Sequence, residues 1–462
     1  MVWGCVQYGV YGTQNISSLT TWTNYVYFVL TRKDKMKAIF KKIITDFQEQ
    51  QLKPKVSRDM EIPVDSGKIV SLIGVRRSGK TSILFNIVNT LRKTIDPDRI
   101  VYINFEDDRL FPLEIGDLND LVEAYFELHP ANRNKKIYLF LDEIQNVDHW
   151  EKFVRRIYDT LNAEIFITGS SSKLLSSEIA SALRGRTFTY EIFPFSFAEY
   201  LRFRNIDVNM HSSRSLSYMI NAFDDYILHG GFAETIDVFP EIRSRILSDY
   251  ADLIIYKNII ERYGIKNHAL MKHLVKYCFS NVATSLSMTK LYNDFKSQGF
   301  KVGKDTLFDY FSYLNDAFAV FSTPVFRNSV REEQRNPKKI YSVDNGFKSL
   351  YSVSLSPDLG RLYENAAFLH LRRKSREVYY YLGNQEVDFY CRTDNGIIIT
   401  NVSFDISNPD TRKRELNGLV EALQFFDYEK GFLLTKDHEE TLIHNGKTII
   451  ILPLWKWLLD EP

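Results

Sequence analysis

The sequence predicts an α/β fold that begins with a parallel sheet and ends with a second, smaller α/β module. Three observations indicate the parallel sheet. Apolar strand patterns alternate with helical patterns, a glycine-rich turn joins the first strand to a helix, and an acidic pair ends a later strand. Apolar runs without alternation are typical of strands that are buried on both faces of such a sheet. We expect strands at 69–73, 100–105, 137–142, 165–169 and 187–192.

Length, charge and cysteine content restrict the classes of protein that the sequence fits. A chain of 462 residues is too long for one hydrophobic core, so we expect several domains. The formal net charge of +1 excludes a polycation, and any contact with nucleic acid must come from local basic patches. Cys5, Cys278 and Cys391 lie far apart, which argues against structural zinc and favours a reducing, cytoplasmic location.

Residues 1–35 stand apart from the rest of the chain as a tail. Residues 1–30 carry no charged side chain, yet polar residues interrupt the apolar ones throughout. The apolar runs fall short of the roughly 20 residues that cross a bilayer, so we expect no membrane span. The tail is either disordered or absent from the native protein, because a helical apolar pattern opens at Met36 and translation could start there.

The strongest motif is a phosphate-binding loop between the first strand and a helix, in the segment KIVSLIGVRRSGKTSILFNIVNTL. It fits G-x-x-x-x-G-K-[ST], whose backbone amides at a helix N-terminus bind phosphate oxygens. We expect Lys80 to reach the β- and γ-phosphates of ATP, and the Thr81 hydroxyl to bind Mg²⁺. The predicted nucleotide-binding residues are Gly74, Val75, Arg76, Arg77, Ser78, Gly79, Lys80, Thr81 and Ser82.

An acidic pair at the end of the strand 137–142 supplies the predicted partner of this loop. Asp142 is expected to bind Mg²⁺, and Glu143 to polarise the attacking water. The alternative, a solvated start of a helix, fits Asp148 and Glu151 better, because they form a capping pattern before WEKFVRRIYDTL.

Two further features could complete a catalytic site. Ser170 or Ser171, after the strand at 165–169, would lie beside the γ-phosphate and sense hydrolysis, although any such turn favours small polar residues. Arg184 and Arg186 precede the last strand, and one of them could stabilise charge across a subunit boundary in a homo-oligomer. The alternative for both arginines is an ordinary surface position.

The segments GVRRSGKTS, VYINFEDDRL, LFLDEIQNVDHWE, FITGSSSKLL and LRGRTFTYEIFPFSFAEYL together resemble an archaeal and bacterial AAA+-type (P-loop) ATPase family with a C-terminal domain of unknown function. The resemblance is strongest over residues 40–200. It implies an ATPase domain at 36–200 and a helical lid at 201–262. It also implies that Gly230 and Gly231, in HGGFAET, approach the adenine, although Ala233 stands where the family has proline.

Residues 263–345 have the pattern of a winged helix-turn-helix. Helices are expected at 288–297 and 305–317, with Leu307, Phe311 and Leu314 in the core, and two strands flank a polar loop. The loop is basic, as contact with DNA phosphates requires, but acidic residues accompany it. Binding of DNA and docking of a protein therefore both remain open. The basic residues are Arg327, Arg331, Arg335, Lys338 and Lys339; the acidic ones are Asp305, Asp309, Glu332 and Glu333.

Residues 346–462 resemble the C-terminal module of the same family, which is similar to a restriction-endonuclease fold. Glu364 and Asp388 match two of its acidic metal-binding positions, but Asn401 and Ser403 replace the E-x-K that should follow. We therefore expect no nuclease activity. Basic residues nearby could still hold DNA, or could form a solvated helix face: Arg372, Arg373, Lys374, Arg376, Arg412, Lys413 and Arg414.

These patterns predict a magnesium-dependent ATPase, a hydrolase whose nucleotide state switches a C-terminal half that contacts DNA or a protein. Two alternatives stay open. One is an ATP-dependent endonuclease that uses Glu364 and Asp388. The other is an ATP-regulated scaffold that binds only protein.

Overall fold

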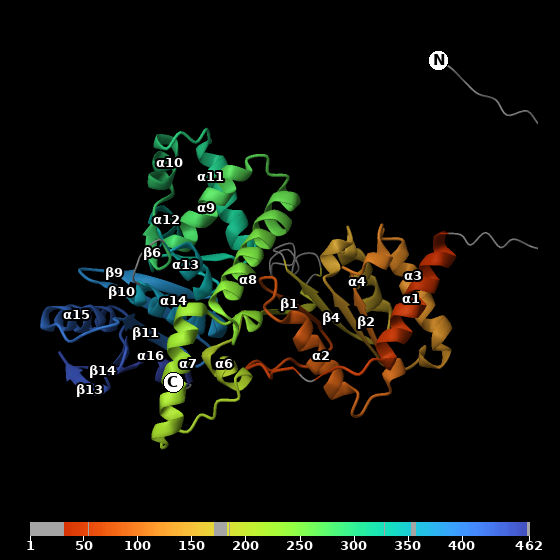
Figure 1. The fold of residues 1–462 in the computed structure, drawn as a ribbon, viewed down its shortest axis with the longest axis horizontal. Helices are drawn as coiled ribbons and strands as arrows, with labels where there is room; N and C mark the ends of the chain where they lie inside the picture. Colours follow the sequence, from red (N-terminus) through yellow and green to blue (C-terminus); the bar gives the residue numbers. More distant parts are fainter. Residues whose placement is uncertain are drawn as a thin grey trace, which may run out of the picture.

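The computed structural model describes residues 32–53, 55–170, 183, 185–327, 329–352 and 357–459 (Figure 1). Nearly all of the predicted tail, together with Ser171 and Arg184, lies outside these residues. None of the helices in the described ranges combines the length and the hydropathy that would let it cross a bilayer.

The first domain contains a five-stranded, wholly parallel sheet with the strand order β2-β3-β4-β1-β5. This confirms the five predicted strands to within two residues at each end. The strands are β1 (Ile69–Ile73), β2 (Ile100–Asn104), β3 (Ile137–Asp142), β4 (Ala163–Gly169) and β5 (Thr187–Glu191). The helices are α1 (Arg32–Glu49), α2 (Lys80–Leu91), α3 (Asp117–Leu128) and α4 (Trp150–Thr160).

Alternate residues of β1 lie on opposite faces of the sheet, which explains why four of its five residues are apolar. Ile69 and Ile73 belong to a hydrophobic cluster on one face of the sheet, and Val70 and Leu72 to a second cluster on the other. Successive side chains of a strand point to opposite faces, so a strand that is covered on both sides favours apolar residues on both, with Ser71 the one polar residue of β1.

Helices follow the sheet and lead into the C-terminal half. They are α6 (Phe197–Phe203), α7 (Ser213–His229), α8 (Pro240–Leu253), the π-helical segment η7 (Ile254–Glu261) and α9 (His268–Ser280). A small three-stranded sheet with the order β6-β8-β7 comes next. It consists of β6 (Thr284–Leu286), β7 (Val320–Thr323) and β8 (Lys338–Ser342), with α10 (Met288–Ser297), α11 (Lys304–Asp316), α12 (Val330–Arg335) and α13 (Asn345–Tyr351).

The last part of the chain forms a mixed six-stranded sheet with the order β13-β14-β12-β11-β10-β9. The elements are α14 (Leu359–Lys374), β9 (Val378–Leu382), β10 (Glu386–Thr393), β11 (Gly396–Val402), α15 (Pro409–Phe425), β12 (Lys430–Thr435), β13 (Glu440–His444), β14 (Lys447–Pro453) and α16 (Leu454–Leu459). The hairpin between β13 and β14 turns at Asn445 and Gly446, both with positive φ, as the Asn-Gly dipeptide predicts.

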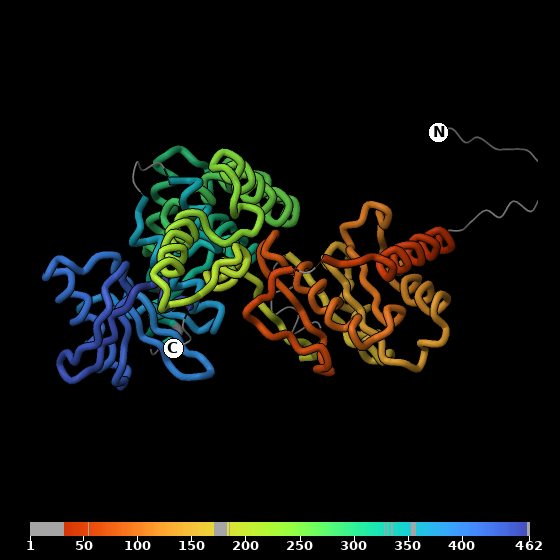
Figure 2. The backbone as a smooth tube through the Cα atoms, turned by 60° about the horizontal axis from the view of Figure 1, so that its bottom comes forward, coloured from red at the N-terminus to blue at the C-terminus, as the bar shows by residue number. Residues whose placement is uncertain are grey.

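The two larger sheets lie at opposite ends of the molecule, with the helices α6 to α9 between them (Figures 1 and 2). The larger hydrophobic cluster runs from the first sheet through these helices to Phe389 and Trp457. Helix α14 packs against α7, and α16 against α6. The ATPase-like domain and the C-terminal half therefore share one continuous core.

Candidate nucleotide site

Two glycines allow the loop between β1 and α2 to adopt positive φ angles. Gly74 has φ 147° and Gly79 has φ 93°, a region that residues with a Cβ rarely adopt. A Cβ on Gly74 would lie 2.1 Å from the carbonyl oxygen of Ile192, so β5 also requires glycine there. Gly79 is the N-cap of α2, which directs the free amides of the first helical turn toward the loop.

Lys80 begins α2 and is 5% exposed. Its Nζ donates to the carbonyl oxygens of Gly74 and Val75, at 3.1 Å each, and lies 3.8 Å from Glu143 Oε1. Burial lowers the pKa of the Lys80 ammonium, and the carboxylates of Glu143 and Asp142 oppose this shift. The ammonium is thus held within the loop by neutral carbonyls.

The phosphate loop and the end of β3 meet at Asp142. The Thr81 hydroxyl donates to Asp142 Oδ2 at 2.8 Å, and Tyr102 donates to the same oxygen at 2.7 Å. The Thr168 hydroxyl donates to Oδ1. Burial raises the pKa of Asp142, while these three hydrogen bonds act to lower it. Thr81 and Asp142, the two residues expected to hold Mg²⁺, are therefore in direct contact.

Glu143 follows Asp142 in a left-handed conformation, with φ 53°. Its amide donates to Thr168 Oγ1 at 2.9 Å, and Gln145 Nε2 donates to its Oε2 at 2.5 Å. Burial would raise the pKa of Glu143, but the Lys80 ammonium and the Gln145 hydrogen bond outweigh burial, and the pKa is lowered. Glu143 is consequently a carboxylate that can accept a hydrogen bond from a water molecule.

Ser170 directly follows β4 beside this pair and is buried. Its carbonyl accepts a hydrogen bond from Asn258 Nδ2 at 3.2 Å, and Arg76 Nε donates to Asn258 Oδ1 at 3.2 Å. Asn258 comes from η7, and π-helical turns often occur at functional sites. Asn258 is not among the residues that the sequence predicts for the site; its only signal is a polar residue within the apolar run IIYKNII.

The residues of the loop fit a triphosphate. The Ser78 hydroxyl is buried and has no hydrogen-bond partner among the described residues, so a phosphate oxygen would satisfy it. Lys80 can exchange two carbonyl oxygens for phosphate oxygens. Arg76 and Ser170 also line a cleft of 540 Å³ that reaches Gln145 and Asn258.

The Gly230-Gly231 turn contacts the C-terminal half, and its contact with the adenine stays a prediction. The amide of Gly230 donates to Tyr226, and that of Gly231 donates to Asp344 Oδ2 at 2.7 Å. A Cβ on Gly230 would lie 1.7 Å from Asp344, so the glycine admits a buried carboxylate from the C-terminal half. Glu234, three residues after Gly231, connects this turn to the phosphate loop, because its Oε1 lies 3.1 Å from Arg77 Nη1.

Arg186 lies at the amino-terminal ends of the parallel strands, whereas the phosphate loop follows the carboxyl end of β1. Its carbonyl accepts from the amide of Ile69, at the start of β1, and its Nε is 3.2 Å from Asp159 Oδ1. The loop follows the other end of β1, so Arg186 cannot reach a nucleotide bound by its own chain. A role across a subunit boundary stays a prediction.

The acidic residues of the C-terminal sheet surround a lysine. Lys339, expected on a basic wing, is 3% exposed, and its Nζ lies 3.0 Å from Glu364, 2.8 Å from Asp388 and 2.7 Å from Glu386. Lys339 is therefore unavailable to DNA. In the described parts of the chain, no group of three or more His, Cys, Asp or Glu residues could hold a metal ion.

The basic end of α14 also differs from its expected role as a free surface. Arg372 and Arg376 both pair with Glu191 Oε1, at 2.9 and 2.8 Å, and Arg373 donates to the carbonyl of Pro194 at 2.8 Å. These three arginines bind the end of β5 and the segment after it. They join α14 and the residues just after it to the first domain.

Two family models match the chain. Residues 66–201 match the model of an AAA domain, and residues 220–355 match a domain of unknown function, DUF8612. With the parallel sheet and the phosphate loop, the first match indicates that residues 66–201 have the fold of an AAA-type P-loop domain, a fold associated with nucleotide binding and hydrolysis.

Relatives cover almost the whole chain. The uncharacterized protein MJ1544 of Methanocaldococcus jannaschii is 36% identical, over 92% of this chain and 96% of that protein. An uncharacterized protein of Haemophilus influenzae is 28% identical, over 86% of this chain and 95% of its own length. The chain belongs to the family of the M. jannaschii protein.

Solved structures are more distant. The Aeropyrum pernix ORC1 protein, solved in complex with DNA, gives a TM-score of 0.32 and 13% identity over 72% of this chain and 94% of that chain. AMPPCP-bound DnaA from Aquifex aeolicus gives a TM-score of 0.22 and 12% identity, over 60% of this chain and 86% of that one. Likeness at this level carries no argument about function.

Proposed function

We propose that this protein binds ATP between the phosphate loop and the end of β3, and hydrolyses it. The observation that carries the proposal is the contact between Thr81 and Asp142, which brings both expected magnesium ligands to one point. Buried Lys80 and ionised Glu143, the chain neighbours of these two residues, lie 3.8 Å apart.

The role of each residue follows from its chemistry. Lys80 would leave the carbonyls of Gly74 and Val75 and bind phosphate oxygens, whose charge attracts it more strongly. Thr81 and Asp142 would hold Mg²⁺, which would neutralise charge on the phosphates. Glu143 would orient and polarise the attacking water. Ser170, beside Glu143, would respond to the γ-phosphate.

We further propose that the nucleotide state changes the position of the C-terminal half. Asn258 supports this, because it contacts the phosphate loop through Arg76 and the end of β4 through Ser170. Loss of the γ-phosphate would alter both contacts at once and move the lid helix that carries Asn258.

The C-terminal half would contact DNA or a protein. The order of α9 to α11 with the sheet β6-β8-β7 supports a winged helix, and the order α14, β9 to β11, α15, β12 supports an endonuclease-like module. Burial of Lys339 and internal pairing of Arg372 and Arg376 weaken the case for extensive DNA contact. We do not propose cleavage, since a lysine lies among the carboxylates that cleavage would require.

Buried free thiols at Cys278 and Cys391 agree with the cytoplasmic location that we propose.

ATP turnover by the purified protein tests this proposal. Lys80→Ala should abolish turnover, and Lys93→Ala, at an exposed lysine in the turn after the same helix, should leave it unchanged. Equal turnover in the wild type and Lys80→Ala would refute the site. Repeating the assay with single-stranded, double-stranded and branched DNA distinguishes the partners. Stimulation by one form supports a DNA-contacting switch, and no salt-sensitive DNA binding supports a protein scaffold.

A further inference from the structure

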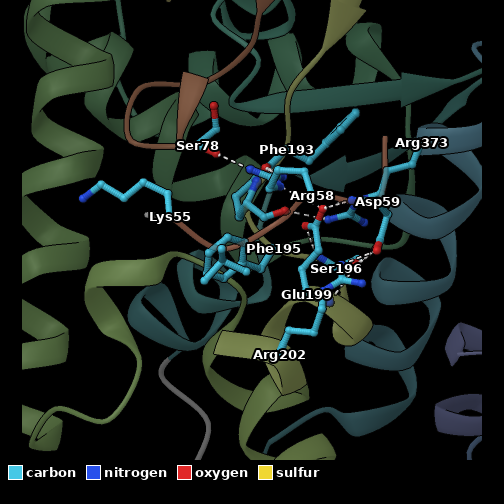
Figure 3. Close-up of polar contacts among 12 residues, drawn as sticks. Lys55, Arg58, Asp59, Ser78, Phe193, Phe195, Ser196, Glu199, Arg202 and Arg373 are labelled. Carbon is cyan, nitrogen blue, oxygen red and sulfur yellow. Dashed lines mark hydrogen bonds and ion pairs between the residues drawn. The ribbon is translucent and has the colours of Figure 1, made fainter. Parts of the chain in front are cut away.

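Arg58 lies in the segment between α1 and β1 and reaches two other parts of the first domain (Figure 3). Its Nη1 donates to the carbonyl oxygen of Ser78 in the phosphate loop at 2.9 Å, and its Nη2 donates to the carbonyl of Phe193 at 2.6 Å. Its Nε donates to Glu199 Oε1 at 2.8 Å. A single guanidinium thus joins the phosphate loop to the chain that follows β5.

The position of this guanidinium is fixed by its surroundings. Its side chain is 10% exposed, and that of Glu199 is 5% exposed. Glu199 also accepts from the amides of Asp59 and Ser196, the latter as part of the capping box that begins α6. Charged hydrogen bonds in such a buried setting hold their geometry more firmly than neutral ones.

The chain that follows β5 connects in turn to α14. Arg373 donates to the carbonyl of Pro194 at 2.8 Å, and its guanidinium lies 5.3 Å from the centre of the Phe193 ring. Ile192 immediately precedes Phe193. Its amide donates to the carbonyl of Ile73, the residue before the phosphate loop. The segment 191–195 therefore lies between the phosphate loop and α14.

Helix α14 continues the connection into the C-terminal half. Glu364 on this helix accepts hydrogen bonds from Lys339 at 3.0 Å and from Tyr341 at 2.8 Å, both on β8. A displacement of α14 would therefore displace the small sheet that contains β8, because a buried ion cluster cannot separate without leaving unpaired charges.

We propose that Arg58 is a positioning residue that ties the phosphate loop to the segment 191–195, and so transmits a nucleotide-induced change in the loop to α14. The inference rests on the proposed nucleotide site and adds the route by which that site acts. A guanidinium suits this role because its planar set of donors can serve three acceptors in fixed directions. A purely structural Arg58 would stabilise the fold without affecting the response of α14.

Hydrogen exchange of the α14 peptides, with and without a non-hydrolysable ATP analogue and Mg²⁺, tests the route. In the wild type, saturating analogue should change exchange across 359–374. Arg58→Ala should bind the analogue about tenfold more weakly, as expected for one lost charged hydrogen bond. At saturation it should show no change in α14.

Two further variants complete the test. Arg202→Ala is the matched control, since Arg202 pairs with neighbouring Asp59 and makes no hydrogen bond to the phosphate loop that the structure records; it should respond like the wild type. Arg373→Ala should bind the analogue normally and lose the α14 response, and it replaces Arg58→Ala if that variant does not fold.

The possible failures can be told apart. A wild-type protein that does not bind the analogue overturns the proposed function, and this inference with it. A wild-type protein that binds without any change in α14 overturns the inference alone. A full change of α14 exchange in Arg58→Ala or Arg373→Ala, each saturated with the analogue, also overturns the inference alone.

Discussion

Two buried lysines of this molecule each face acidic side chains, and their surroundings differ in one respect. Lys80 lies 3.8 Å from Glu143 and donates to backbone carbonyls, whereas Lys339 is within 3.0 Å of Glu364, Asp388 and Glu386. Both side chains are no more than 5% exposed. The first lysine can exchange weak acceptors for a phosphate, and the second already binds its anions.

The pKa directions agree with this contrast. Burial lowers the pKa of Lys80 despite nearby carboxylates. Burial acts in the same direction on Lys339, but Asp388 and Glu364 outweigh it and raise its pKa well above the ordinary value. The same residue types therefore make the proposed nucleotide site in one domain and an internal cross-link in the other. Direct contact between the ammonium and the carboxylates makes the difference.

The largest effect should come from the carboxylate beside Lys80. Glu143→Gln keeps the shape of the side chain but removes its charge, so ATP turnover should fall by a factor of about 10² to 10⁴ while ATP still binds. Steady-state hydrolysis and equilibrium binding measure the two quantities. Glu151→Gln, in the first turn of α4, is the control and should keep wild-type turnover. Undiminished turnover in Glu143→Gln would remove the residue from the mechanism.

Lys339→Met tests the role of the second lysine in the stability of the fold. Loss of the ammonium leaves Glu364 and Asp388 buried without their cation, so the free energy of unfolding should fall by about 3–5 kcal/mol. Denaturant titration measures it, and Lys338→Met, at a less buried neighbour, should change it by about 0.5 kcal/mol or less. A variant as stable as the wild type would show that the cluster does not stabilise the fold. DNA cutting with Mg²⁺ by this variant would restore the nuclease alternative.

Another buried carboxylate, Asp344, is bound by the amides of Gly231 and Gly346 and not by a lysine. Burial raises its pKa to about 7, while these amides and Arg373 oppose the shift. Between about pH 4 and 7, the folded state keeps a proton that the unfolded state has lost. Stability should therefore decrease as pH rises, by up to about 1.4 kcal/mol per pH unit.

Asp344→Asn should remove this part of the pH dependence. Unfolding of both proteins between pH 4.5 and 8 measures it, because every other titrating group is common to the two and cancels in the difference. Parallel stability curves for the two proteins would contradict the account of Asp344.

The smallest effect is expected at an ion pair that solvent reaches. Arg186→Ala breaks the pair with Asp159, and the free energy of unfolding should change by less than about 1 kcal/mol. Turnover measured over a range of protein concentrations tests its predicted role in trans. A loss of turnover that appears only where the wild type self-associates supports that role, and unchanged turnover at all concentrations rejects it.

Sequence patterns predicted the parts of the fold that depend on local order. The five parallel strands, the phosphate loop and the helices α10 and α11 follow from periodicity and from a motif with fixed spacing. These features are encoded over short stretches, so one sequence is sufficient to find them.

Local sequence patterns do not predict contacts between distant segments. Lys339 is basic and lies in a polar stretch, and only the packing of β8 against α14 and β10 shows that it is buried. The sequence around Arg372 and Arg376 is compatible with a solvated helix end. Only the structure shows that both side chains pair with Glu191. Asn258 depends on a π-helical turn, and no local pattern specifies which residue such a turn directs inward.

The most direct test of the central claim concerns Thr81. If its hydroxyl and Asp142 share one magnesium ion with ATP, then Mg²⁺ should tighten binding of an ATP analogue to the wild type. Thr81→Ala should lose that tightening, and Thr90→Ala, on the exposed side of the same helix, should keep it. Equal dependence on Mg²⁺ in the wild type and Thr81→Ala would contradict the account.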